Sequence, residues 1–278
     1  MEPISPLYTA ELFVPLHDEL IRLLEGLRPE DWTRPTLAGE WRVRDIVAHL
    51  VEVDLRRLSV GRDGHLIAPD RPIASYRDLV TFLNDLNARW VSAASRLSTR
   101  VLIELLQYSG PAMARLVADL PPHAPAVFAV DWAGETQSEN WFDIGRDYTE
   151  RWHHQMQIRD AVGAPPLLEP RWSVPLFDLS FRSLPRAYAS VDAQDGSTVE
   201  LHVGGDTGTA WTLQRDHAAW RLWRGTSPGA TTMISVDPDT AWRILYNAIP
   251  LSEARDRTRV EGDPTLAAPF YAARSVMV

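Results

Sequence analysis

A glutamate and a histidine four positions apart, Glu150 and His154, form the first candidate for metal chemistry in this sequence. Residues at this spacing on an α-helix differ in direction by about 40°, so both side chains project from one face and can hold the same ion. His153 is turned by about 100° from His154 and is not expected to share that face. The spacing alone is weak evidence, because helix surfaces often carry such pairs.

A metal site would need a third ligand from a neighbouring element, and His49 is the best candidate. It lies within an otherwise apolar run, residues 46–51, where an imidazole without a partner would cost free energy. A core histidine bonded to a backbone carbonyl would explain the same position. The residues alone therefore leave both interpretations open.

The composition excludes several kinds of catalysis. The chain has no cysteine, and all 28 of its basic residues are arginine. It therefore has no thiol nucleophile of its own, no lysine for a Schiff base and no P-loop. It also lacks the Gly-x-Ser-x-Gly, His-Glu-x-x-His and Gly-x-Gly-x-x-Gly motifs. Any thiol that this protein uses must come from a small molecule.

Charge and hydropathy limit the partners. The 37 acidic residues outnumber the 28 basic ones and give a formal charge of −9, which repels phosphate backbones, so no nucleic-acid partner is expected. No apolar stretch approaches the roughly 20 residues that span a bilayer, so no membrane partner is expected. The first residues lack the charged and apolar regions of a signal peptide. We expect a cytoplasmic protein, and a homodimer is left open.

Two segments resemble the signatures of one protein family. Residues 39–50, GEWRVRDIVAHL, resemble the "G-W-x-V-x-D-x-x-x-H-L" signature of the DinB-like metalloproteins. Residues 148–163, YTERWHHQMQIRDAVG, resemble the second signature of that family. The likeness is in particular to the amino-terminal domain of mycothiol-dependent maleylpyruvate isomerases and mycothiol S-transferases, and it covers about residues 1–165. More loosely, residues 237–242 and 260–263 resemble a sterol-carrier-protein-like module.

This resemblance implies a metal site and a reaction. The metal ligands would be His49, Glu150 and His154, and the metal would be zinc or another divalent ion. Two histidines and one carboxylate leave a coordination position open, which is the catalytic pattern. Mycothiol would be the thiol co-substrate of a transferase or isomerase acting on an electrophilic small molecule, in detoxification or natural-product biosynthesis. In place of the aspartate that several isomerase-like members have three residues after the second histidine, this chain has Gln157.

Further site residues follow from the same resemblance. Asp45, one helical turn before His49, and Arg151 are candidate catalytic residues that would orient the ligands. The isomerases also use an arginine of their second domain near the active site. The candidates here are Arg215, Arg221, Arg224 and Arg243, of which we retain Arg221 and Arg243 as cofactor-binding residues.

Two alternative functions remain open at this point. A metal-dependent hydrolase on the same scaffold would need no thiol, and Glu52 or Asp54 would be its candidate base, although a solvated helix face explains both residues more simply. A non-catalytic protein could instead use its 11 tryptophans to line a ligand pocket.

Amphipathic helices must position these residues in the first half of the chain. Apolar side chains at spacings of three and four predict helices over 9–27, 43–60, 75–97, 100–120 and 141–162. Ser75 is the expected N-cap of the third, Gly110-Pro111 should bend or break the fourth, and Gly163 should end the fifth. Helices joined by modest loops predict a four-helix bundle, residues 1–165.

The second half has a different pattern. Residues 163–175 are rich in proline and predict a linker, followed by a helix over 176–189. Period-two patterns predict strands at 199–203, 210–213, 220–223, 231–236 and 259–261, with a turn at 204–208. Asp237-Pro238 should open a helix to about 248, and a last helix should begin at Pro264. We therefore predict an α+β protein, its smaller α+β domain covering 166–278.

Overall fold

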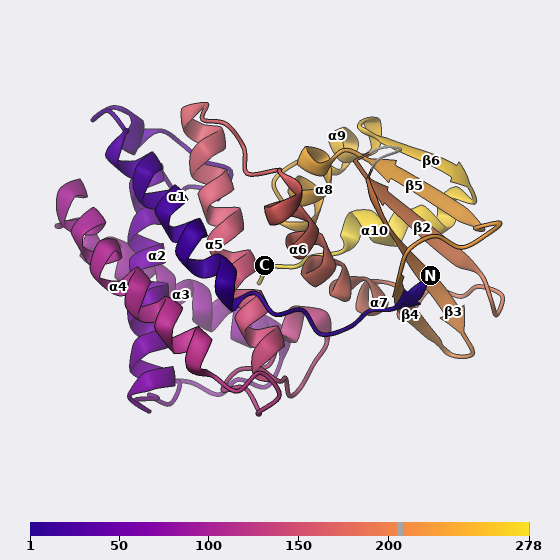
Figure 1. The fold of residues 1–278 in the computed structure, drawn as a ribbon, viewed down its shortest axis with the longest axis horizontal. Coiled ribbons are helices and arrows are strands. Elements are labelled where there is room, and N and C mark those ends of the chain that lie inside the picture. Colours follow the sequence, from indigo (N-terminus) through magenta and orange to yellow (C-terminus); the bar gives the residue numbers. More distant parts are fainter. Residues whose placement is uncertain (205–207, 278) are drawn as a thin grey trace. The chain divides into compact units, whose positions relative to one another are not determined.

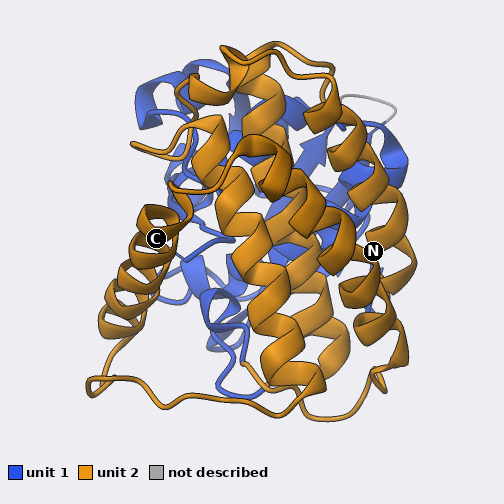
Figure 2. Ribbon diagram, turned by 90° about the vertical axis from the view of Figure 1, so that its left-hand side faces the viewer, with its two compact units in different colours: residues 1–7, 129–137, 167–278 blue, residues 8–128, 138–166 orange. Residues whose placement is uncertain are grey.

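The computed structural model describes residues 1–204 and 208–277, which divide into two compact units (Figures 1 and 2). One unit comprises residues 8–128 and 138–166 and is helical. The other comprises residues 1–7, 129–137 and 167–278 and contains the sheet. The α+β fold class predicted from the sequence is confirmed. Part of the predicted turn at 204–208 lies outside the described residues.

The helical unit is a bundle in which α1, α4, α2 and α5 contact one another in turn, and α3 packs on α2 (Figure 1). Its helices are α1 (Phe13–Glu25), α2 (Val43–Arg57), α3 (Tyr76–Ala94), α4 (Thr99–Asp119) and α5 (Asn140–Val162). The core packs α1, α2 and α4 through Leu20, Leu24, Val43, Ile46, Val47, Leu50, Leu102 and Leu106. The stripes at spacings of three and four are therefore the buried faces, as predicted.

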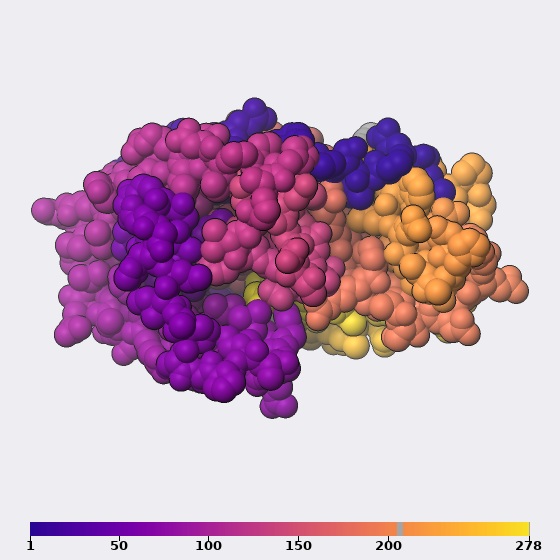
Figure 3. All heavy atoms as spheres, turned by 90° about the horizontal axis from the view of Figure 1, so that it is seen from below, coloured from indigo at the N-terminus to yellow at the C-terminus, as the bar shows by residue number. Residues whose placement is uncertain are grey.

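Helix ends follow the predicted capping chemistry. The Ser75 hydroxyl accepts a hydrogen bond from the backbone N–H of Asp78, at 3.1 Å. Gly163 ends α5 with φ 68°, a left-handed conformation that favours glycine. Between α2 and α3, a π-turn (Leu58–Arg62) leads into a loop at residues 63–75 that lies on the surface (Figure 3).

Two predictions about proline and glycine need correction. Helix α4 is not broken at Gly110-Pro111, one of the two outcomes expected there, but continues through both residues. A Cβ atom at position 110 would lie 2.2 Å from the ring of His17, so the glycine allows α1 and α4 to approach closely at this ring. The predicted linker at 163–175 is shorter, because α6 begins at Pro170 and includes Pro175. Proline is tolerated at a first helical position, where no backbone donor is needed.

The second unit is built on a mixed sheet in the order β1-β4-β3-β2-β5-β6. Its strands are β1 (Glu2–Pro3), β2 (Thr198–Val203), β3 (Thr209–Asp216), β4 (Ala219–Arg224), β5 (Thr232–Val236) and β6 (Thr258–Gly262). Strands β2 and β5 are parallel, and the other neighbours are antiparallel. Strand β1 was not predicted from the sequence.

Helices of this unit gather on one side of the sheet (Figure 1). They are α6 (Pro170–Ser180), α7 (Leu184–Ala187), α8 (Pro238–Leu245), α9 (Leu251–Asp256) and α10 (Ala268–Ala272). A buried hydrogen bond of 2.7 Å from the indole N–H of Trp211 to Asp178 ties α6 to β3. Asp237 caps α8 through the backbone N–H of Thr240, as predicted.

Candidate metal centre

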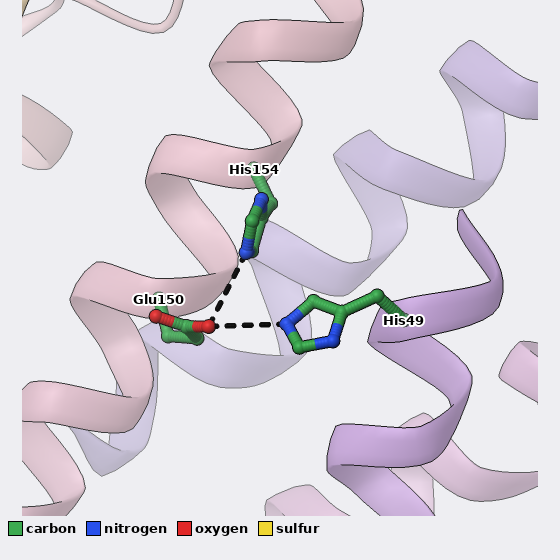
Figure 4. Close-up of side chains that lie close together, drawn as sticks. All are labelled: His49, Glu150 and His154. Carbon is green, nitrogen blue, oxygen red and sulfur yellow. Dashed lines mark hydrogen bonds and ion pairs between the residues drawn. The ribbon is translucent and has the colours of Figure 1, made fainter. Parts of the chain in front are cut away.

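Helices α2 and α5 bring the three predicted ligands together. His49 lies on α2, whereas Glu150 and His154 lie one turn apart on α5. Among the described residues, one ligand atom from each of the three lies within 4.8 Å of the other two (Figure 4). Residues 101 positions apart in the sequence thus form one cluster.

One carboxylate oxygen is the centre of this cluster. Oε1 of Glu150 lies 3.2 Å from Nε2 of His49 and 3.2 Å from Nε2 of His154 (Figure 4). The histidine side chains are 4% and 9% exposed, and that of Glu150 is 25% exposed. The cluster is therefore shielded from solvent mainly on its histidine side.

The hydrogen bond behind His154 defines which nitrogen faces the cluster. Its Nδ1 lies 2.8 Å from the side-chain oxygen of Gln157, a residue that is 4% exposed. Because a carbonyl oxygen only accepts, Nδ1–H donates to Gln157, and Nε2 is the nitrogen that faces the cluster. Nε2 lies 3.2 Å from Oε1 of Glu150, which is also 3.2 Å from Nε2 of His49. Two imidazole nitrogens thus converge on one carboxylate oxygen, and this donor set fits a divalent ion.

The protonation states favour metal binding. Burial lowers the pKa of His49 to about 4, although the hydrogen bond to Glu150 opposes the shift. Burial alone would raise the pKa of Glu150, but His154 and then His49 outweigh it and hold that pKa well below its usual range. At neutral pH His49 is therefore neutral and Glu150 is ionised, the forms that ligate metals.

Two aromatic contacts define the surroundings of the cluster. The ring of Trp41 lies 5.1 Å from that of His49 and 6.2 Å from that of His154, between centroids. It therefore covers both imidazoles from one side. The ring of His153 lies 4.0 Å from that of His154 between centroids, but His153 is not among the converging ligand atoms. Its Nδ1 donates to the backbone oxygen of Thr149 at 3.0 Å.

Buried ion pairs fix the register of α2 against α5. Arg57 on α2 contacts Asp143 at 2.8 Å and Asp147 at 2.7 Å on α5. The side chain of Arg57 is 7% exposed and those of both aspartates are 2% exposed. Buried charges of this kind are tolerated only when they are paired, so these contacts hold one alignment of the two helices. That alignment places His49 opposite Glu150.

The structure gives the two predicted catalytic residues local contacts. The carboxylate of Asp45 accepts the backbone N–H of Arg42 at 2.9 Å and so caps the start of α2. Arg151 donates to Asp54 at 2.6 Å and to the backbone oxygen of Asp147 at 3.0 Å. Among the hydrogen bonds of the described residues, it is Gln157 that orients a predicted ligand.

The predicted arginines of the second unit lie on the sheet and on α8. Arg221 is exposed and pairs with Asp216 at 2.8 Å. Arg243 is 15% exposed and pairs with Asp239 at 2.8 Å. Their assignment to cofactor binding remains a prediction.

Three residues near the cluster were not assigned to it from the sequence. Trp41 lies inside the first signature, and Gln157 was noted only as a departure from the family pattern. Glu52 was considered as a base for a hydrolase, with a solvated face as the simpler explanation. That explanation is wrong, because the side chain of Glu52 is 16% exposed and its Oε2 is fully buried.

The fold and this cluster define a two-unit α+β protein whose helical bundle gathers two imidazoles and a carboxylate. Residues 13–159, more than half of the chain, match the model of the mycothiol maleylpyruvate isomerase N-terminal domain. The chain belongs to this family and is an enzyme of the thiol-dependent isomerase and transferase class. The family resemblance of segments 39–50 and 148–163 is thereby confirmed, and the non-catalytic alternative is set aside.

Two solved structures are similar over nearly the whole chain. One is a point mutant of the mycothiol-dependent maleylpyruvate isomerase, with 11% identity, a TM-score of 0.58, and 94% of this chain and 96% of that chain covered. The other is the mycothiol-dependent maleylpyruvate isomerase itself, with 12% identity, a TM-score of 0.55, and 88% and 91% covered. At these identities the likeness establishes the fold. We found no significant match among curated proteins.

The helices were compared with the requirements for crossing a membrane. Within residues 1–204 and 208–277, none combines the length and the apolar character that a bilayer span requires.

Proposed function

We propose that this enzyme is a zinc-dependent mycothiol S-transferase or isomerase. It would activate the mycothiol sulfur for attack on, or exchange at, an electrophilic carbon of a small molecule, in detoxification or natural-product biosynthesis. The observation that carries the proposal is the convergence of one ligand atom each from His49, Glu150 and His154, which lie within 4.8 Å of one another.

The ligand set would consist of His49, Glu150 and His154. Bound there, zinc would lower the pKa of a thiol, which is about 8.5 for a free cysteine, and so supply a thiolate at neutral pH. Two neutral imidazoles and one carboxylate leave room for such a sulfur. Because the chain has no cysteine, the sulfur must come from a separate molecule.

The other residues of the site would shape and exclude water from it. Gln157 holds the ring of His154 in the orientation and tautomer that expose its Nε2. Trp41 covers both imidazoles on one side, which limits the approach of water from there. Arg221 and Arg243 remain our candidates for holding mycothiol, and an increased KM for mycothiol in their alanine variants is the expected result.

Metal content and thiol dependence together test the proposal. His49→Ala and His154→Ala should each lose zinc by elemental analysis. His123→Ala is a matched control, because His123 also pairs with a glutamate, Glu139, at 3.0 Å, but is 58% exposed. The unmodified enzyme should convert members of an electrophile panel only when mycothiol is added. Full zinc retention in both ligand variants would overturn the ligand set, and turnover without thiol would favour the hydrolase alternative.

A further inference from the structure

Glu52 is a buried carboxylate beside the cluster that the proposed ligand set does not use. It follows His49 by three residues on α2, so the two side chains differ in direction by about 60° and lie one turn apart. Its Oε1 pairs with Nε of Arg56 at 3.2 Å. Its Oε2 is buried and makes no hydrogen bond to the described residues.

The other buried carboxylates of the bundle are occupied by partners. Asp54 accepts from Arg151 at 2.6 Å and from Ser109 at 2.8 Å, one bond to each oxygen. Asp143 and Asp147 both pair with Arg57. Glu52 differs from them because its ion pair with Arg56 uses Oε1 and leaves Oε2 available to a proton. A buried acceptor without a donor is costly, and such exceptions often mark catalytic groups.

The charges around Glu52 favour proton uptake. Burial raises the pKa of Glu52, Arg56 on the same helix lowers it, and the negative charge of Glu150 on α5 raises it again. The net direction is upward. A carboxylate with a raised pKa is better matched to a thiol than an exposed one, because efficient transfer requires similar proton affinities.

Glu52 is close to the ligand cluster without belonging to it. The described atoms that converge within 4.8 Å come from His49, Glu150 and His154, and Glu52 is not among them. Its electrostatic interaction with Glu150 nevertheless places the two carboxylates within range of each other. This position suits a group that exchanges protons with a bound substrate.

We propose that Glu52 is a catalytic residue that accepts the proton of mycothiol when the thiol binds. This inference rests on the proposed function. The S–H bond breaks, an O–H bond forms at Oε2 of Glu52, and the sulfur keeps the electron pair. That pair forms the C–S bond to the electrophilic carbon. In an addition, the π electrons of the substrate are displaced onto a neighbouring atom, and that atom takes the proton from Glu52. In an isomerisation, the C–S bond breaks again, and the released sulfur takes the proton back from Glu52.

A count of protons released on binding tests this step independently of turnover. Mycothiol is titrated calorimetrically into the zinc-loaded enzyme at pH 7 in two buffers that differ in ionisation enthalpy. A thiol with a pKa of about 8.5 is almost fully protonated at this pH. If Glu52 takes the proton, the unmodified enzyme releases close to none to the buffer. In Glu52→Gln the proton has no acceptor there, and about one should be released per thiol bound.

Two further variants control for charge and folding. Glu104→Gln removes a glutamate that likewise pairs with an arginine four residues away on a helix, at 2.9 Å, but is 54% exposed. It should behave as the unmodified enzyme. Glu52→Asp keeps a carboxylate and should bring the proton release back toward zero. It also tests the inference if Glu52→Gln does not fold, since release of one proton by the aspartate variant would contradict the proposal.

The outcomes separate this inference from the function on which it rests. If the unmodified enzyme binds no mycothiol, the proposed function is overturned. If it binds mycothiol and releases as many protons as Glu52→Gln, only the role of Glu52 is overturned. Zinc content is measured on the same samples. A loss of zinc in Glu52→Gln but not in Glu104→Gln would identify Glu52 as a support of the metal site and would also contradict the proposal.

Discussion

Replacing Gln157 by leucine should weaken metal binding although Gln157 is not itself a proposed ligand. Its side-chain oxygen accepts the proton on Nδ1 of His154 at 2.8 Å. In the leucine variant that buried N–H has no partner, so the ring gains by moving its proton to Nε2. There it can donate to Oε1 of Glu150, 3.2 Å away. The metal must then displace a hydrogen-bonded proton before it can bind.

The size of the effect follows from the behaviour of such supporting groups. Loss of a partner behind a ligating histidine weakens metal binding about 10- to 100-fold. This corresponds to about 1.4–2.7 kcal/mol. An unpaired buried N–H costs about 1–3 kcal/mol, which agrees in magnitude. Gln157→Glu retains an acceptor with a stronger pull on the proton and should bind metal at least as tightly as the unmodified enzyme.

The assay is a competition titration of zinc against a chromophoric chelator at pH 7. Gln107→Leu is the matched control, because Gln107 also makes a short side-chain hydrogen bond, 2.9 Å to Glu25, but at an exposed site on α4. Nitrogen chemical shifts of His154 in the apoprotein provide a second measurement and should show the proton moving from Nδ1 to Nε2. An affinity for Gln157→Leu within about threefold of the control would refute the reasoning.

Three more outcomes test the packing around the site. Gly110→Ala should destabilise the protein by about 1–3 kcal/mol through overpacking, because its Cβ would lie 2.2 Å from the His17 ring. In a His17→Ala background the same substitution should instead stabilise the protein by about 1 kcal/mol through helix propensity. Thermal denaturation of the unmodified protein, both single variants and the double variant tests this reversal of sign. Arg57→Leu should cost about 1–3 kcal/mol in urea unfolding, because Asp143 and Asp147 lose their buried pairs with Arg57 and keep those with Arg146 at 2.6 and 3.3 Å. An unchanged free energy of unfolding would contradict a stabilising role of Arg57. The apoprotein should lose stability as the pH falls from about 6.5 to about 4, because the unfolded chain binds a proton at His49 and the folded chain does not. The loss should be smaller in His49→Leu. If the free energy of unfolding depends on pH equally in both proteins, the lowered pKa of His49 is contradicted.

Much of the helical unit could be predicted from local patterns. The stripes that include Leu20, Ile46 and Leu102 are the buried stripes of the structure. Capping residues such as Ser75 and Gly163 stand where the helices begin and end. These features depend on neighbours within one or two turns of the same helix, and so the spacing of residues in the sequence predicts them.

Errors arose where a residue serves a distant part of the chain. Gly110-Pro111 was expected to bend or break its helix; the helix is continuous, and Gly110 accommodates His17, 93 positions earlier in the sequence, on α1. Strand β1 is two residues long and exists because it pairs with β4 far along the chain. Local propensity contains no information about such partners.

The candidate site shows the same division. The pairing of Glu150 with His154 follows from helix geometry. The apolar surroundings of His49 made it a candidate third ligand, and the family resemblance then implied that role. That Gln157 turns its oxygen to His154, or that Trp41 covers both rings, depends on rotamers and on the register between α2 and α5. That register is set by Arg57 and its aspartates, whose sequence positions resemble ordinary surface charges.

The buried polar residues of helix α5 show where this protein needs partners for charged and polar side chains. Most of its residues are buried, yet they include aspartates, histidines and glutamines rather than a simple apolar stripe. Burying such groups without partners would cost more free energy than a bundle of this size can supply. The aspartates are paired with Arg57 and Arg146, and Gln157 with His154. The imidazoles of His49 and His154 instead converge on one carboxylate oxygen of Glu150, which gathers donor atoms at a single point where a cation would bind.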